Sequence, residues 1–138
     1  MKLQQRTDFA LRALLFLADS GGATPTAIAD AHGISASHLA KVMSALSAAG
    51  FVRAERGRGK LATLARPAED ITVGDVVRTF EPFDLAECFR GDQCALTRRC
   101  NLQRALGDAR DAFLAILDEV SLASLQTRTT RQLTRLRI

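Results

Sequence analysis

Residues 24–50 of the chain read TPTAIADAHGISASHLAKVMSALSAAG. Thr24 before Pro25 predicts a helix start, because threonine caps the first free amide groups and proline suits the first helical position. Gly33 predicts the end of this short helix, and Ser35 predicts the cap of a longer one that Gly50 ends. The longer helix carries one apolar stripe, made of Leu39, Val42, Met43 and Leu46. A short helix, a glycine turn and a longer helix predict a helix-turn-helix.

The flanking sequence predicts the rest of a winged helix-turn-helix. Apolar residues recur at helical spacing from Asp8 to Ala18, which indicates a helix in front of the motif. Residues 51–55 and 61–65 read as two short strands around the turn RGRGK, so we expect a β-hairpin wing with a basic tip. Thr72 with Asp75 then resembles a capping box that opens a further helix.

A second helical pattern follows a loop at residues 81–100. Its apolar residues alternate steps of four and three, as in a coiled-coil seam, at Leu102, Leu106, Ala109, Phe113, Ile116 and Val120. This pattern favours a dimerisation helix, and the alternative is that the helix packs within its own chain. The expected fold is mainly α, a winged helix-turn-helix with a small β-hairpin wing and a long C-terminal dimerisation helix.

Four segments follow from this interpretation. We expect a DNA-binding domain at residues 1–80, a cysteine sensor loop at 81–100, a dimerisation helix at 101–125 and a basic, disordered tail at 126–138. Charge is distributed unevenly along the chain. Residues 1–66 hold nine lysines and arginines against four acids, whereas the whole chain has a net charge of only +4. A basic front half favours a polyanionic partner such as DNA.

The composition also excludes several classes of function. Tryptophan and tyrosine are absent, which disfavours base stacking on single strands and favours double-stranded DNA. No apolar run reaches membrane-spanning length, so we expect a cytoplasmic protein without a membrane partner. The only histidines are His32 and His38, and no nucleophile-base pair or phosphate-binding glycine motif is found. The sequence therefore does not indicate an enzyme.

The DNA contacts are expected at the start of the second helix of the motif and at the wing. The recognition helix enters the major groove through its N-terminal residues, which here are Ser35, Ser37, His38 and Lys41. At the wing tip Arg56, Arg58 and Lys60 are expected to reach flanking phosphates or the minor groove. For single residues a duller role stays open, since Ser35 could act only as a helix cap and His38 only as a solvated side chain.

Three cysteines, Cys88, Cys94 and Cys100, are spaced C-x5-C-x5-C in the predicted loop. Zinc sites usually have tighter pairs and a fourth ligand. Three thiolates suit an iron-sulfur cluster whose last iron takes a non-cysteine ligand. This favours a 4Fe-4S cluster over a 2Fe-2S one. The alternatives are a thiol-redox or zinc-stabilised module, or three unrelated buried cysteines.

Over nearly its whole length the chain resembles the Rrf2 family of winged-helix regulators. The matching features are Thr7-Asp8-Phe9-Ala10-Leu11-Arg12, Ile34-Ser35, His38-Leu39, Lys41-Val42, Gly50-Phe51-Val52, Arg56-Gly57, Arg66-Pro67 and Ile71-Thr72-Val73-Gly74-Asp75-Val76-Val77. Glu81-Pro82, Leu85 and Glu87-Cys88-Phe89 resemble its nitric-oxide-sensing branch most. Another branch has a histidine ligand three residues after the last cysteine, where this chain has Gln103.

The resemblance implies a homodimeric repressor with one iron-sulfur cluster per subunit, held by Cys88, Cys94 and Cys100. In some such proteins an aspartate in the first helix of the partner subunit completes coordination, and Asp8 is the matching residue. The alternative for Asp8 is a favourable acid in the first helical turn. Nitric oxide would nitrosylate the cluster and release operator DNA. A regulator that reports iron or cluster supply is the alternative within the family.

Overall fold

The computed structural model describes residues 2–54, 61–89 and 100–126. Three features expected from the sequence lie outside these ranges: the wing tip with Arg56, Arg58 and Lys60, the central Cys94, and the basic tail. The described residues form α1 (Gln5–Ser20), α2 (Pro25–His32), α3 (Ala36–Ala48), β1 (Val52–Ala54), β2 (Ala62–Leu64), α4 (Val73–Phe80) and α5 (Asn101–Asp118), with short 3-10 turns at Ala68–Asp70, Glu87–Phe89 and Ala123–Leu125.

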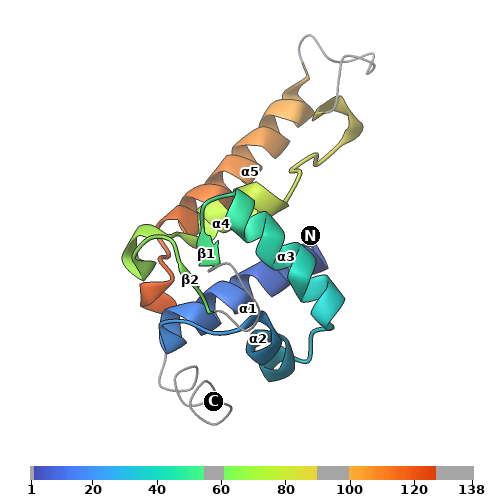
Figure 1. Ribbon diagram of the computed structural model, residues 1–138. Coiled ribbons are helices and arrows are strands. Elements are labelled where there is room, and N and C mark those ends of the chain that lie inside the picture. The colour runs from blue at the N-terminus through green and yellow to red at the C-terminus, as the bar shows by residue number, and fades with distance from the viewer. Residues whose placement is uncertain (1, 55–60, 90–99, 127–138) are drawn as a thin grey trace.

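The helix-turn-helix is present as expected, with α2 and α3 as its two helices (Figure 1). The Thr24 hydroxyl accepts a hydrogen bond from the amide of Ala27, and the Ser35 hydroxyl accepts one from His38. Gly33 between the helices has a φ of 62°, in the left-handed region that favours glycine. Local chemistry therefore determines both helix starts and the turn between them.

The wing begins as a short antiparallel pair, in which β1 pairs with β2 so that Val52 lies opposite Leu64. The strands are shorter than the expected 51–55 and 61–65. The segment after α1 adds to the pair, because Ala23 and Ala62 exchange backbone hydrogen bonds of 3.0 and 2.8 Å. This bridge joins the hairpin to the start of the helix-turn-helix. The helical content and the small hairpin confirm the expected winged-helix fold.

The main core lies between α1, α2, α3 and the hairpin. Its most deeply buried side chains include Leu14, Leu17, Ile28, Leu39 and Leu46. Helix α1 is longer at both ends than the expected 8–18, and Gly21 ends it with a φ of 74°. The predicted capping box is confirmed, since Thr72 and Asp75 each accept a hydrogen bond from the other's backbone amide.

Helix α5 ends at Asp118, and the chain then returns to the core. The amide of Val73 donates to the carbonyl of Val120, and that of Leu122 donates to Ile71. Leu122 is fully buried in the main core. This return segment anchors the C-terminal end of α5, while its N-terminal end extends away from α1–α3 (Figure 1).

The helix predicted at 101–125 is shorter than expected, because α5 ends at Asp118 and the last predicted seam residue, Val120, lies beyond it. Phe113 and Val120, which the sequence placed in a dimerisation seam, have contacts within the chain, with the cluster of Val73, Val77 and Leu114. Helix α5 therefore has one face covered by α4 and another that the single chain leaves exposed. Leu102 and Ile116 from the same predicted seam remain 65% and 67% exposed. The apolar face left open on α5 is therefore narrower than expected and rotated from the expected one.

Candidate DNA-binding surface and cysteine site

The expected contact residues of the recognition helix lie together at the N-terminal end of α3. Ser35, Ser37, His38 and Lys41 are all exposed. The Ser35 hydroxyl caps the helix and lies 3.4 Å from that of Ser37. The His38 ring lies against α1, with its centroid 6.4 Å from that of Phe9. Ser35 thus has the capping role that the sequence left open, and its hydroxyl is also within hydrogen-bond distance of Ser37.

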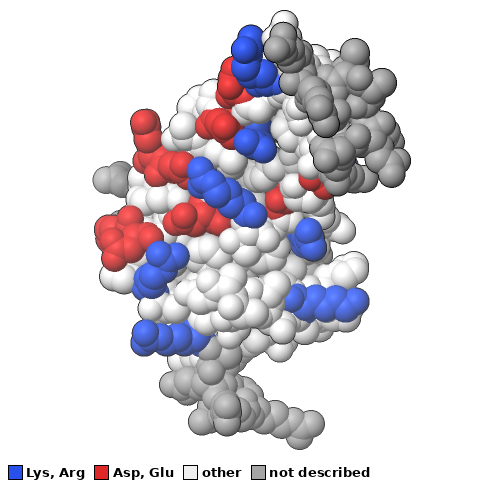
Figure 2. Space-filling model, turned by 90° about the horizontal axis from the view of Figure 1, so that it is seen from above, with Lys and Arg blue, Asp and Glu red and all other residues white. Residues whose placement is uncertain are grey.

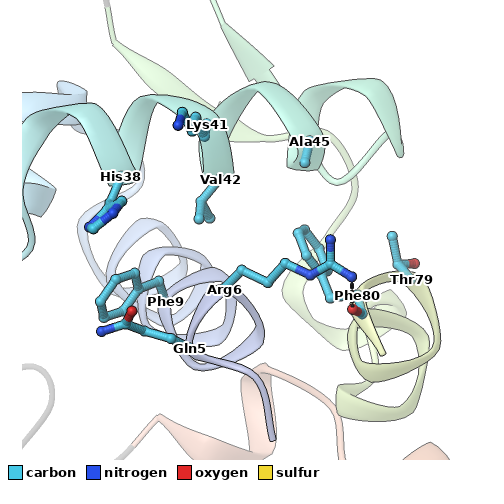
Figure 3. A pocket seen from close by; sticks show the side chains of 9 residues that line it. All are labelled: Gln5, Arg6, Phe9, His38, Lys41, Val42, Ala45, Thr79 and Phe80. Carbon is cyan, nitrogen blue, oxygen red and sulfur yellow. Dashed lines mark hydrogen bonds between the residues drawn. The ribbon is translucent and has the colours of Figure 1, made fainter. Parts of the chain in front are cut away.

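A cavity of about 370 Å³ opens beside this end of α3, between α3, α1 and the end of α4 (Figure 3). Its wall includes His38, Lys41 and Val42 from α3, and its floor includes Arg6 and Phe9 from α1. The sequence did not indicate this cavity, because its walls come from three helices far apart in the chain.

The start of α1 is held against the end of α4 by a small polar cluster. The Glu81 carboxylate accepts hydrogen bonds from the Thr7 hydroxyl at 2.5 Å and from the Gln4 amide at 2.7 Å. Thr7 is fully buried. The Arg6 guanidinium donates to the carbonyl of Phe80 at 2.7 Å. These hydrogen bonds join the start of α1, the helix that supports α3, to the end of α4, after which the segment with the cysteines begins.

Asp8 lies on α1 beside this cluster, and its carboxylate is about half exposed. Both of its oxygens contact the Arg12 guanidinium at 3.0 Å, one turn further along the helix. Such an exposed pair contributes little stability. A stronger ligand could therefore displace Arg12 from Asp8 at small cost.

Two of the three cysteines lie at the N-terminal end of α5. Cys100 is the residue before the helix, and Cys88 lies in the Glu87–Phe89 turn; both are free thiols of intermediate burial. The Gln103 side-chain amide donates to the Cys88 carbonyl at 3.0 Å. The Arg110 guanidinium lies over the Phe89 ring, 5.8 Å from its centroid. Two side chains of α5 thus hold the turn that carries the first cysteine.

The sequence did not identify Gln103 and Arg110 as part of this site, because nothing in their spacing marks a contact with a turn 15 to 21 residues earlier. Gln103 stood out only as a residue that is not histidine. Within the described ranges no three potential metal ligands converge. Cys94 is outside those ranges, and among the described residues Asp8 does not join Cys88 and Cys100 in a ligand group.

At the base of α5 an ion pair fastens the helix to α4. Arg78 and Asp118 form a bidentate pair, with one N–O distance of 2.5 Å. The hydrogen bond from Arg78 holds the pKa of Asp118 below its ordinary value. Gly74 allows this approach, because a Cβ there would lie 1.9 Å from an Asp118 oxygen.

Acidic side chains gather toward one side of the face in Figure 2, whereas the basic ones are spread across it.

Comparisons with known proteins place this geometry in a family. The model of the Rrf2 family, described as an iron-dependent transcriptional regulator, matches residues 3–128. The chain belongs to the Rrf2 family of transcriptional regulators. A winged helix-turn-helix in such a regulator is a DNA-binding unit, and in that motif the second helix enters the major groove through its N-terminal residues. None of the described helices is both long enough and apolar enough to cross a membrane.

Solved structures of similar fold include regulators of different kinds. CymR, the global cysteine regulator of B. subtilis, is 27% identical, with 91% of this chain and 95% of that chain covered and a TM-score of 0.72. The oxidized form of Staphylococcus aureus CymR is 25% identical, with the same coverage and TM-score. IscR of T. potens is 25% identical, with 91% and 85% covered and a TM-score of 0.70.

Proposed function

We propose that this Rrf2 protein is a homodimeric iron-sulfur repressor of the nitric-oxide-sensing kind known as NsrR. It binds palindromic double-stranded operator DNA and releases it when nitric oxide reaches the cluster. Its targets would be genes for nitric-oxide detoxification. The cluster, when bound, supplies iron that reacts with nitric oxide. Cys88, Cys94 and Cys100 would hold it, because soft thiolates are the ligands that iron-sulfur clusters take in proteins.

The observation that carries the proposal is the position of the cysteine turn. Gln103 and Arg110 hold the turn of Cys88 beside the start of α5, where Cys100 precedes the first helical residue. A helix N-terminus favours thiolate over thiol. The two cysteines are unpaired and only partly buried, which keeps them open to an incoming cluster.

A homodimer is supported by the exposed face of α5. Its apolar residues alternate steps of three and four and are all exposed: Leu102, Ala105, Ala109, Ala112 and Ile116. This is the spacing of a coiled-coil seam, and the alanines at its centre permit a close approach of two helices. A neighbouring face of the helix packs on α4 within the chain. A second copy of the helix is the occupant that the spacing favours.

In such a dimer, we infer that Asp8 of one subunit is the non-cysteine ligand for the cluster of the other. Its carboxylate is about half exposed, and the Arg12 pair that holds it is weak enough to exchange. Coordination would then link the sensor loop of one subunit to α1 of its partner. Loss of the cluster would free α1 and change the spacing of the two recognition helices.

The test is an absorbance spectrum of anaerobically purified protein before and after stoichiometric nitric oxide, with operator binding measured in parallel. A brown chromophore that bleaches as DNA is released is expected. Cys100→Ser should be colourless, whereas the matched Ser124→Ala, a change away from the site, should keep the chromophore. A chromophore unaffected by nitric oxide would contradict the signal and favour a reporter of iron or cluster supply.

A thiol-redox regulator is the second candidate function. It is favoured by the similarity to CymR, one structure of which is an oxidized form, and by the two free cysteines at the head of α5. A protein that is colourless when purified anaerobically, yet binds operator DNA in a manner reversed by mild oxidation, would establish this function and contradict the cluster. A colourless protein that oxidation leaves unchanged would favour a zinc-stabilised module.

A further inference from the structure

The cavity beside the recognition helix has aromatic groups at both ends. His38 and Phe9 lie side by side at one end, and Phe80 lies at the other, beyond the extended Arg6 side chain (Figure 3). Val42 points into the space between them. A volume of about 370 Å³ is within the range of cavities that hold small molecules. The aromatic and aliphatic side chains of the lining suit a small, flat ring.

The polar groups of the cavity are all cationic or neutral. Arg6 and Lys41 both contribute to the lining, and no aspartate or glutamate lines it. Arg6 uses one of its five N–H donors on the Phe80 carbonyl. Within the part of the chain that the structure describes, Lys41 makes no ion pair. A ligand with a negative head group would compensate both charges, and carboxylate matches a guanidinium especially well.

We propose that this cavity binds a small aromatic carboxylate. Its carboxylate lies between Arg6 and Lys41, and its ring lies against Phe9 and His38. The site is separate from the cysteines at the far end of α5. It shares His38 and Lys41 with the surface that meets DNA, so a ligand here would compete with phosphates for Lys41. Ligand and operator would then weaken each other's binding by the same factor. That consequence rests on the proposed function, whereas ligand binding itself does not.

The experiment is a titration of the full chain with benzoate, without DNA or nitric oxide, followed by the ring proton signals of histidine in NMR spectra. The chain has two histidines, and His32 packs edge-on against Phe16, outside the cavity, as an internal control. Benzoate should shift the His38 signal in a saturable way and leave His32 unchanged. A dissociation constant on the order of 1 mM is expected for so small a ligand. Benzamidine, of the same shape with a positive head group, should produce no such shift.

Three variants make the assignment specific. Lys41→Ala should weaken benzoate binding about tenfold, as the loss of a charged hydrogen bond implies. Ala45→Leu places a larger side chain in the exposed wall of the cavity and should abolish the binding. Arg53→Ala removes an exposed cation of β1, outside the cavity, and should leave the binding unchanged.

The proposal is overturned if benzoate gives no saturable shift at about ten times the expected dissociation constant. It is also overturned if benzamidine shifts His38 equally, or if Lys41→Ala and Arg53→Ala weaken benzoate alike, because the effect would then be general charge attraction. None of these readings depends on a cluster, on operator DNA or on nitric oxide. Failure here and failure of the proposed function are therefore distinguishable.

Discussion

Truncating Ile116 to alanine should weaken the dimer without unfolding the chain. Ile116 is 67% exposed on α5 and belongs to neither apolar core of the single chain. Its side chain therefore contributes little to the folding of one subunit. If the exposed seam of α5 is the dimer interface, this side chain is one of the two large apolar groups that the interface buries, together with Leu102.

The size of the effect follows from the exposed fraction. Full burial of an isoleucine side chain is worth about 1.5–3 kcal/mol. Two thirds of that value remains to be gained in the dimer, or about 1–2 kcal/mol for each subunit. A twofold interface uses the residue twice, so the loss is about 2–4 kcal/mol and the dimer dissociation constant should rise about 30- to 1,000-fold.

Sedimentation equilibrium across a dilution series measures this constant directly. Leu61→Ala is the matched control, because Leu61 is a similar apolar residue, 48% exposed, that lies beside the hairpin and not on α5. Far-ultraviolet circular dichroism should be unchanged in both variants. A dissociation constant for Ile116→Ala equal to that of the wild type, or to that of Leu61→Ala, would refute the placement of the interface on this face.

Three further outcomes are expected. Gln103→Ala removes the hydrogen bond to the turn of Cys88, so iodoacetamide should alkylate that thiol about two- to tenfold faster. Arg104→Ala is the control, and equal alkylation rates in the two variants would contradict the anchoring role of Gln103. Leu114→Ala should lower the free energy of unfolding in urea by about 2–5 kcal/mol, because the side chain is buried between α4 and α5; a negligible loss would mean that these helices are not packed. The folded-state pKa of Asp118 is lowered by its guanidinium partner, so the stability it contributes is present above about pH 4 and is lost as the pH falls through the lowered pKa. Between about pH 5 and about pH 3 the wild type should lose more stability than Asp118→Asn, and parallel curves would count against the ion pair.

Much of the DNA-binding unit could be predicted because its signals are local. Thr24, Ser35 and Thr72 each accept a hydrogen bond from an amide three residues later, and such a cap depends only on neighbouring residues. Gly33 takes the left-handed conformation that few other residues adopt. The ends of the two strands were predicted less well, because where a strand ends depends on the segments that pair with it.

The candidate site was only partly predictable. The residue types of the cysteine segment pointed to its chemistry, but Gln103 and Arg110 gained their roles only when the chain folded back onto α5. The cavity at Arg6 and Lys41 left no signal in the sequence either. Both features join residues that are distant along the chain, and no spacing rule relates such residues.

Helix α5 shows the division between sequence and tertiary structure most clearly. By itself, the sequence predicted an amphipathic helix at residues 101–125, because the period of apolar residues reflects the turn of the backbone, and the structure has this helix at 101–118. It could not say which neighbour covers which face, since α4 and a second chain would both select apolar residues. Only the tertiary structure separated them: Phe113, Leu114 and Leu117 pack within the chain, while Leu102 and Ile116 stay exposed. Burial is a property of the assembled surfaces, and it is settled only when the helices have packed.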